Sequence, residues 1–189
     1  CNMNDVNAIA QITDYLFSSH GLIYDKEWGR ERYGFKNTSG NMDLHGYIDK
    51  LNSNVVNCYD QAGAICALGC LLGVNVDYRY MSPFGYINTI EIVGIGSSNN
   101  PLFENPGNTG GIVTGEDDIW PIRFPFGNHA FTNYQGYIYD ATAGANVGSR
   151  SESQYVMDTI DRTPAPEATA AGNVSNIQQG TVTDLMCPP

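Results

Sequence analysis

Three residues of this sequence carry side chains that could act together on a carbonyl group: Cys58, His129 and Asp140. A cysteine thiolate is a nucleophile, an imidazole can take and return a proton, and a carboxylate can orient the imidazole and support its charged form. In this scheme Cys58 attacks the carbonyl carbon, His129 moves the proton, and Asp140 holds the imidazole tautomer. The chemistry would be acyl transfer through a thioester.

Cys58 is predicted to open a helix. Asn57 can act as the N-cap, an apolar run follows Cys58, and Gly73 can end the helix. The run is apolar nearly all round, which predicts a buried helix. The partial positive charge at its N-terminus would stabilise a thiolate, and the unpaired N–H groups there could hold an oxyanion. Cys66 and Cys70 lie further along the helix and are predicted to pack in the core.

The other two residues lie on a predicted hairpin. Residues 126–131 and 137–142 have the character of strands, and residues 134–136 can form the turn between them. Side chains alternate between the two faces of a strand, so the turn decides whether His129 and Asp140 share a face.

Two positions of the turn would place His129 and Asp140 on the same face of the hairpin. If residues 134–135 form a two-residue turn, His129 faces Asp140 directly. If residues 135–136 form it, His129 faces Thr142 and Asp140 is a diagonal neighbour on the same face. A three-residue loop would place His129 and Asp140 on opposite faces and remove the pairing.

Three segments resemble the transglutaminase-like superfamily. Residues 57–62 (NCYDQA) and 71–76 (LLGVNV) resemble its nucleophile helix and the strand that follows. Residues 128–131 (NHAF) resemble its His-Ala-aromatic strand, and residues 137–142 (YIYDAT) resemble its aromatic-x-x-Asp-Pro-Thr strand, with Ala141 where Pro is usual. The resemblance covers about residues 50–145, in the order of the family.

The resemblance implies an α+β protein with a papain-like core, in which N-terminal helices and a buried nucleophile helix pack on an antiparallel sheet. It implies amide chemistry by Cys58, His129 and Asp140 on a protein or peptide substrate. We expect hydrolysis, by a cysteine peptidase or a protein-glutamine deamidase such as a secreted effector or toxin. The alternatives are a protein-crosslinking transglutaminase and a non-catalytic binding module. No cofactor is needed.

The oxyanion-stabilising side chain stays open, because Trp120, Asn57 and Gln61 could each donate a hydrogen bond. A zinc site made of the same three residues is a rival interpretation, since these residue types ligate zinc. The short paired-ligand spacings of zinc sites are missing from the sequence, so no metal site is predicted.

Other charged residues have simpler interpretations. Asp60 is a rival acid, but as the third helical residue it is expected to complement the helix dipole. His20 is expected to be a cation at a helix end, and His45 a residue of a surface or half-buried helix. Residues 116–118 (EDD) could bind calcium, but a lone acidic triplet is more typical of a solvated loop.

The remaining organisation is that of one domain over residues 1–162, with an extended or disordered tail over 163–189. The loop at 96–118 is expected to border the active cleft. The predicted elements are helices over 5–20 and 42–51, and strands over 74–80 and 87–95.

Composition limits the classes of partner. The chain has 189 residues, 42% of them hydrophobic, and a net charge of −11. This charge disfavours nucleic acid and anionic membrane surfaces. The longest apolar run, 63–74, is shorter than the roughly 20 residues that span a bilayer. The five cysteines include Cys1 and Cys187, which either pair, tying back the tail, or stay unpaired. We expect a secreted or extracytoplasmic protein.

Overall fold

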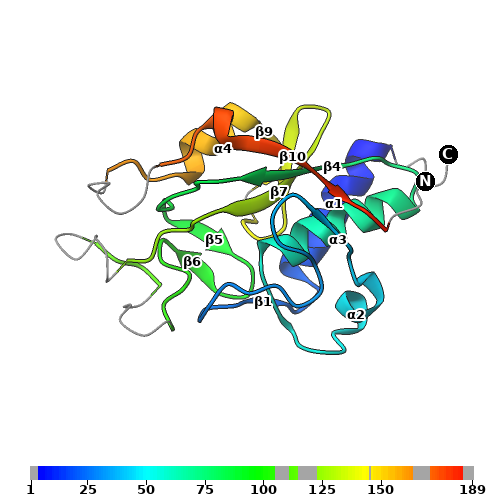
Figure 1. Ribbon diagram of the computed structural model, residues 1–189, viewed down its shortest axis with the longest axis horizontal. Coiled ribbons are helices and arrows are strands. Elements are labelled where there is room, and N and C mark those ends of the chain that lie inside the picture. Colours follow the sequence, from blue (N-terminus) through cyan, green and yellow to red (C-terminus); the bar gives the residue numbers. More distant parts are fainter. Residues whose placement is uncertain (1–3, 105–110, 115–122, 145, 164–170, 185–189) are drawn as a thin grey trace.

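The computed structural model describes residues 4–104, 111–114, 123–144, 146–163 and 171–184 (Figure 1). Its elements, in chain order, are α1 (Asp5–Ser18), β1 (Ile23–Tyr24), β2 (Ser39–Gly40), α2 (Leu44–Asp49), β3 (Val55–Val56), α3 (Cys58–Leu71), β4 (Asp77–Met81), β5 (Ile90–Ile92), β6 (Gly96–Ser98), β7 (His129–Tyr134), β8 (Tyr137–Asp140), β9 (Asn146–Ser151), α4 (Glu152–Thr159), the 3-10 helix η2 (Val174–Asn176) and β10 (Ile177–Val182).

A six-stranded sheet forms the centre, with the strand order β2-β10-β4-β7-β8-β9. Its strands pair antiparallel except for the parallel pair of β10 with β2. Two small sheets accompany it: a parallel pair of β1 with β3, and an antiparallel pair of β5 with β6. The protein is therefore mixed α+β with a mostly antiparallel sheet.

Helix α3 is the central helix, and it packs against α1, β4 and β7. Figure 1 shows α1 and α3 lying together, apart from α4. Most of the residues of α3 are buried, as its apolar sequence predicts. A methyl group at Gly69 would lie 2.9 Å from Val76 Cγ2, so the close contact between α3 and the chain leading into β4 needs a glycine.

The predicted helices at the N-terminal end are confirmed as α1 and α2, and all four of their ends lie within two residues of the expected bounds. The strand expected over 87–95 is shorter. It is broken after Ile92, and Gly94, with a φ of +67°, lies in the turn that leads to β6.

The tail expected over 163–189 is part of the domain where it is described. Strand β10 lies inside the main sheet, between β2 and β4. Its residues Ile177 and Gly180 pair with Met81 and Tyr78 of β4. Its sequence, IQQGTV, is polar and has no clear alternation, which is why the sequence alone suggested a tail.

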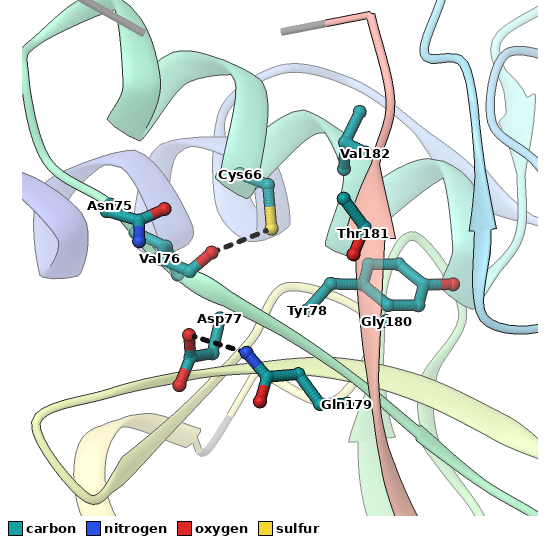
Figure 2. A pocket seen from close by; sticks show the side chains of 9 residues that line it. All are labelled: Cys66, Asn75, Val76, Asp77, Tyr78, Gln179, Gly180, Thr181 and Val182. Atoms are coloured by element: carbon teal, nitrogen blue, oxygen red, sulfur yellow. Dashed lines mark hydrogen bonds between the residues drawn. The ribbon is translucent and has the colours of Figure 1, made fainter.

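The two cysteines inside α3 differ. Cys66 is a free buried thiol whose Sγ–H donates to the Val76 carbonyl at 3.5 Å (Figure 2), and burial raises its pKa. Cys70 is buried in the core, as predicted, and is in addition disulfide-bonded, which the sequence did not predict. Cys1 and Cys187 lie outside the described residues.

A cavity beside Cys66 is also lined by Tyr78, whose ring lies against Gly180 (Figure 2). The Tyr78 hydroxyl is buried and has no hydrogen-bond partner within the described ranges. Cys58 does not line this cavity.

Candidate active site

Cys58 is the first residue of α3, as predicted. Its position is set by a capping box: the Asn57 side chain accepts from the N–H groups of Tyr59 and Asp60, and the Asp60 side chain accepts from the Asn57 N–H. Cys58 is a free thiol and is only 4% exposed. The thiol therefore lies at the positive end of the helix dipole, in a nearly dry environment.

Asp60 is a structural residue. Its buried carboxylate accepts from the backbone N–H groups of Tyr33 (2.7 Å), Gly34 (2.6 Å) and Arg32 (3.0 and 3.1 Å), in addition to that of Asn57 (3.0 Å). Burial raises the pKa of Asp60 although these donors act in the opposite direction. The carboxylate holds the loop that precedes β2 against the start of α3, so Asp60 has no free oxygen for catalysis.

His129 and Asp140 are joined by the hairpin of β7 and β8. Tyr134 pairs with Tyr137 and Thr132 with Tyr139, so the turn is at residues 135–136. Gln135 and Gly136 both have positive φ, at +53° and +87°, which is typical of a type I′ turn. Of the two turns left open by the sequence, the structure has the one that makes Asp140 a diagonal neighbour of His129.

The His129–Asp140 contact is direct. His129 Nε2 lies 2.9 Å from Asp140 Oδ2, and the two residues are 5% and 1% exposed. Because Nε2 is bound to the carboxylate, Nδ1 is the ring nitrogen left to interact with Cys58. An arrangement of this kind could serve as an orienting acid, a base and a nucleophile.

The charge state of His129 is set by its two neighbours. Burial alone would lower its pKa, but the negative charges of Asp140 and Cys58, and hydrogen bonds with both, raise the pKa to about 10. The imidazole is thus held in its protonated form at neutral pH, which favours an ion pair with a thiolate.

Aromatic side chains surround the imidazole. The ring of His129 lies 4.8 Å from that of Phe84, 6.0 Å from that of Phe131 and 6.3 Å from that of Phe126, between centroids. These rings limit the access of water, and a low dielectric strengthens the interactions among Cys58, His129 and Asp140.

A cavity opens on Cys58. Tyr24, Trp28, Gly29, Leu102 and Phe126 are among the residues that line it with Cys58. Leu102 belongs to the 96–118 loop, so the described part of that loop does border the cavity, as expected.

No family model matches the chain, no curated protein matches it, and no solved structure matches it. The resemblance of residues 50–145 to the transglutaminase-like superfamily therefore stays a prediction. What the site can do has to be argued from its own geometry.

Tyr155 is a member of the site that sequence reasoning missed. It lies on α4, is fully buried, and its hydroxyl donates to Asp140 Oδ2 at 2.7 Å. The other carboxylate oxygen, Oδ1, accepts from the backbone N–H groups of Thr142 (2.8 Å) and Ala143 (3.3 Å). Both oxygens of Asp140 are thus held in place. No motif at Tyr155 marks this contact, which only the packing of α4 creates.

The predicted oxyanion donors are already engaged. Asn57 Nδ2 donates to the Gly29 carbonyl at 2.8 Å, and Gln61 Nε2 donates to the Ala141 carbonyl at 2.8 Å. Gln61 Oε1 also accepts from the Tyr47 hydroxyl. Each amide keeps a second N–H, but both residues are fully buried and neither lines the cavity that opens on Cys58, so neither is placed to meet an oxyanion there. Trp120 lies outside the described residues.

The two other histidines lie outside the site. His20 is buried at the end of α1, with Nε2 3.2 Å from the Tyr47 carbonyl. His45 is exposed on α2 and pairs with Asp49 at 3.2 Å. Residues 116–118 lie outside the described residues.

The zinc interpretation does not fit the site geometry. A shared zinc ion would need free donor atoms on these side chains, but His129 Nε2 and Asp140 Oδ2 are bonded directly to each other at 2.9 Å. Within the described ranges, no group of three or more His, Cys, Asp or Glu side chains is arranged to hold a metal ion.

None of the described helices has the length and apolar character needed to cross a bilayer.

Proposed function

We propose that this protein is a thiol hydrolase of transglutaminase-like, papain-like architecture, acting on an amide of a protein or peptide through a thioester on Cys58. The observation that carries the proposal is the 2.9 Å contact of His129 Nε2 with Asp140 Oδ2, in a site where Cys58 also raises the pKa of His129. A histidine that serves only to fill the core is not expected to be kept protonated beside a free thiol.

The reaction follows from these roles. The Cys58 thiolate attacks the amide carbonyl carbon, and the C=O π electrons move to the oxygen. As the tetrahedral intermediate collapses, the C–N bond breaks and the leaving nitrogen takes the proton of the His129 imidazolium. Water then attacks the thioester carbon and gives one proton to His129. The C–S bond breaks, which regenerates the Cys58 thiolate and releases the carboxylic acid as product.

Water is the proposed acceptor because of the charge at the cavity. Among the described residues that line it, Lys36 is charged and none is Asp or Glu. Lys36 is already paired with Glu31 Oε1 at 3.6 Å. A lysine ammonium, the acceptor in protein crosslinking, would therefore have to compete with Lys36 for that carboxylate. The reaction is then peptide cleavage or glutamine deamidation rather than crosslinking.

The test is the pH dependence of iodoacetamide alkylation at Cys58, followed by mass spectrometry in wild type and in His129→Ala. We expect wild type to alkylate rapidly well below pH 8, and the variant to alkylate at least 10-fold more slowly. His45→Ala is the matched control, since His45 is an exposed histidine outside the site. Wild-type labelling no faster than that of a free thiol would instead indicate a non-catalytic binding module.

The reaction type is then tested with carbobenzoxy-Gln-Gly and a Gln-containing oligopeptide, with and without pentylamine. Mass spectrometry distinguishes the Glu product of deamidation, the shorter products of peptide cleavage and the amine adduct of crosslinking. An amine adduct as the main product would contradict water as the acceptor.

We also propose that the protein works in an oxidising, extracytoplasmic compartment. The support is the disulfide at Cys70, because disulfides persist outside the reducing cytosol. Alkylation of denatured protein purified from its native compartment, with and without prior reduction, tests it. A Cys70 that is labelled without reduction would count against the proposal.

A further inference from the structure

The helix that presents Cys58 has few free donors left for an oxyanion. The N–H groups of Tyr59 and Asp60 are bound to Asn57 Oδ1 at 2.9 and 3.2 Å, and that of Gln61 to the Asn57 carbonyl at 3.2 Å. Of the first turn, only the Cys58 N–H has no partner among the described residues. A tetrahedral oxyanion is usually held by two donors, so a second one has to come from elsewhere.

Tyr24 places a hydroxyl in the cavity that opens on Cys58. Both residues line the cavity, and Tyr24 is 2% exposed. No hydrogen-bond partner for its hydroxyl is found in the described part of the chain. Unlike the Tyr78 hydroxyl, the Tyr24 hydroxyl is not fully sealed, so a substrate oxygen that enters the cavity can accept its hydrogen bond.

The position of Tyr24 is fixed by the strands that lead to Cys58. In β1, Tyr24 pairs with Val56 of β3, and β3 ends just before the N-cap of α3. The Tyr24 N–H donates to the Val93 carbonyl at 3.0 Å. The Tyr24 ring meets that of Phe126 edge-on, at 6.0 Å between centroids. Backbone and ring are both held, so the hydroxyl is held too.

The absence of a side chain at Gly29 leaves space for the Tyr24 hydroxyl. A methyl group at Gly29 would lie 3.1 Å from Tyr24 Oη, closer than most real contacts of this kind. The φ of Gly29 is +58°, which also favours glycine.

The hydroxyl keeps its proton. Burial, and then the nearby acidic groups of Cys58, Asp25 and Asp140, raise the pKa of Tyr24 well above its usual range. Tyr24 therefore remains a hydrogen-bond donor whenever Cys58 is a thiolate.

We propose that the Tyr24 hydroxyl and the Cys58 N–H form the oxyanion hole of this protein, an inference that rests on the proposed thiol chemistry. When Cys58 Sγ bonds to the carbonyl carbon, the C=O π electrons move to the oxygen. Tyr24 Oη–H and Cys58 N–H then donate hydrogen bonds to that oxygen without losing their protons. Collapse of the intermediate returns the electrons to the C=O bond.

The experiment compares two reactions at Cys58 in Tyr24→Phe. Acylation by p-nitrophenyl acetate passes through a tetrahedral oxyanion, whereas alkylation by iodoacetamide does not. We expect the acylation rate constant to fall roughly 100-fold and the alkylation rate constant to change less than 2-fold. The unchanged alkylation shows at the same time that the variant is folded with a working nucleophile.

Tyr78→Phe is the matched control, because it removes a tyrosine hydroxyl that has no partner among the described residues, and Tyr78 lines a cavity that Cys58 does not line. Both of its rate constants should stay within 2-fold of wild type. A Tyr24→Phe variant that acylates like wild type overturns the role of Tyr24 while the proposed function stands. A Tyr24→Phe variant in which acylation and alkylation slow by the same factor also overturns this role, because Tyr24 would then affect the reactivity of the Cys58 thiol and not the oxyanion. Wild-type protein that is neither acylated nor rapidly alkylated overturns the proposed function, and the oxyanion hole with it.

Discussion

The hydroxyl of Tyr155 donates to the same oxygen of Asp140, Oδ2, that binds His129 Nε2, at 2.7 Å and 2.9 Å respectively. Helix α4 is thereby connected to the hairpin of β7 and β8 through one buried carboxylate. With the Thr142 and Ala143 N–H groups on Oδ1, Asp140 accepts four hydrogen bonds and has little freedom to rotate. The orientation of the His129 ring consequently depends on a residue far from the sequence motifs of the site.

Tyr155→Phe is expected to destabilise the fold. The substitution removes a hydrogen bond to a charged group in the interior, which contributes about 1.5–3 kcal/mol to the free energy of unfolding. Urea unfolding monitored by circular dichroism measures the change. Tyr78→Phe removes a buried hydroxyl that has no partner in the described part of the chain, so its unfolding free energy should hardly change. Equal losses in the two variants would show that the Tyr155–Asp140 bond adds nothing.

Asp140→Asn is expected to lower both the pKa of His129 and the catalytic rate. Without the negative charge, the effect of burial is no longer offset as strongly, so the pKa falls from its value of about 10. The amide also no longer enforces the working tautomer, and in comparable triads this lowers kcat roughly 10⁴-fold. NMR titration of His129 and acylation by p-nitrophenyl acetate measure the two effects. A variant with the wild-type acylation rate would remove Asp140 from the mechanism.

The stability of the protein is expected to decrease at alkaline pH because of His129. Its pKa is raised from 6.5 to about 10, so the folded state binds this proton more tightly than the unfolded state. The stabilisation is complete below pH 6.5 and is lost as the pH rises through about 10. Urea unfolding of wild type and His129→Gln between these values isolates the contribution. The difference between them should shrink steadily with rising pH, and a constant difference would contradict the assignment.

Asp60→Asn is expected to disturb both the fold and Cys58. The amide group would turn a donor toward backbone N–H groups that now donate to the carboxylate, at a cost of about 3 kcal/mol. The capping box would weaken, so Cys58 alkylation should slow even where the protein is still folded. Urea unfolding and iodoacetamide labelling measure the two effects. Asp49→Asn, in an exposed pair with His45, should change stability by less than about 0.5 kcal/mol.

The local features of the site could be predicted from the sequence. Helix α3 begins at Cys58 because Asn57 and Asp60 supply a complete cap within four consecutive residues, which is a property of the local chain. His129 and Asp140 share a face because a two-residue turn preserves the alternation of side chains, and that too is local.

Only the tertiary structure decided the rest. Of the two possible turns of the hairpin, the structure has the one at residues 135–136. There Gln135 adopts a positive φ that its residue type does not demand. Strand β10 is polar, so its place between β2 and β4 depends on partners more than 90 residues earlier. Asn57 and Gln61 are not placed to hold an oxyanion, because both are fully buried outside the cavity at Cys58, where their amides donate to the carbonyls of Gly29 and Ala141.

Tyr155 and Tyr24 are the clearest examples of site residues that only the tertiary structure reveals. Each approaches the site from an element that the sequence gives no reason to place there, α4 for one and the two-residue strand β1 for the other. A hydroxyl on a tyrosine looks the same in the sequence whether it meets a carboxylate, an empty cavity or solvent. Capping and strand alternation act between near neighbours in the chain and are visible in it, whereas contacts between distant segments depend on how the whole core packs.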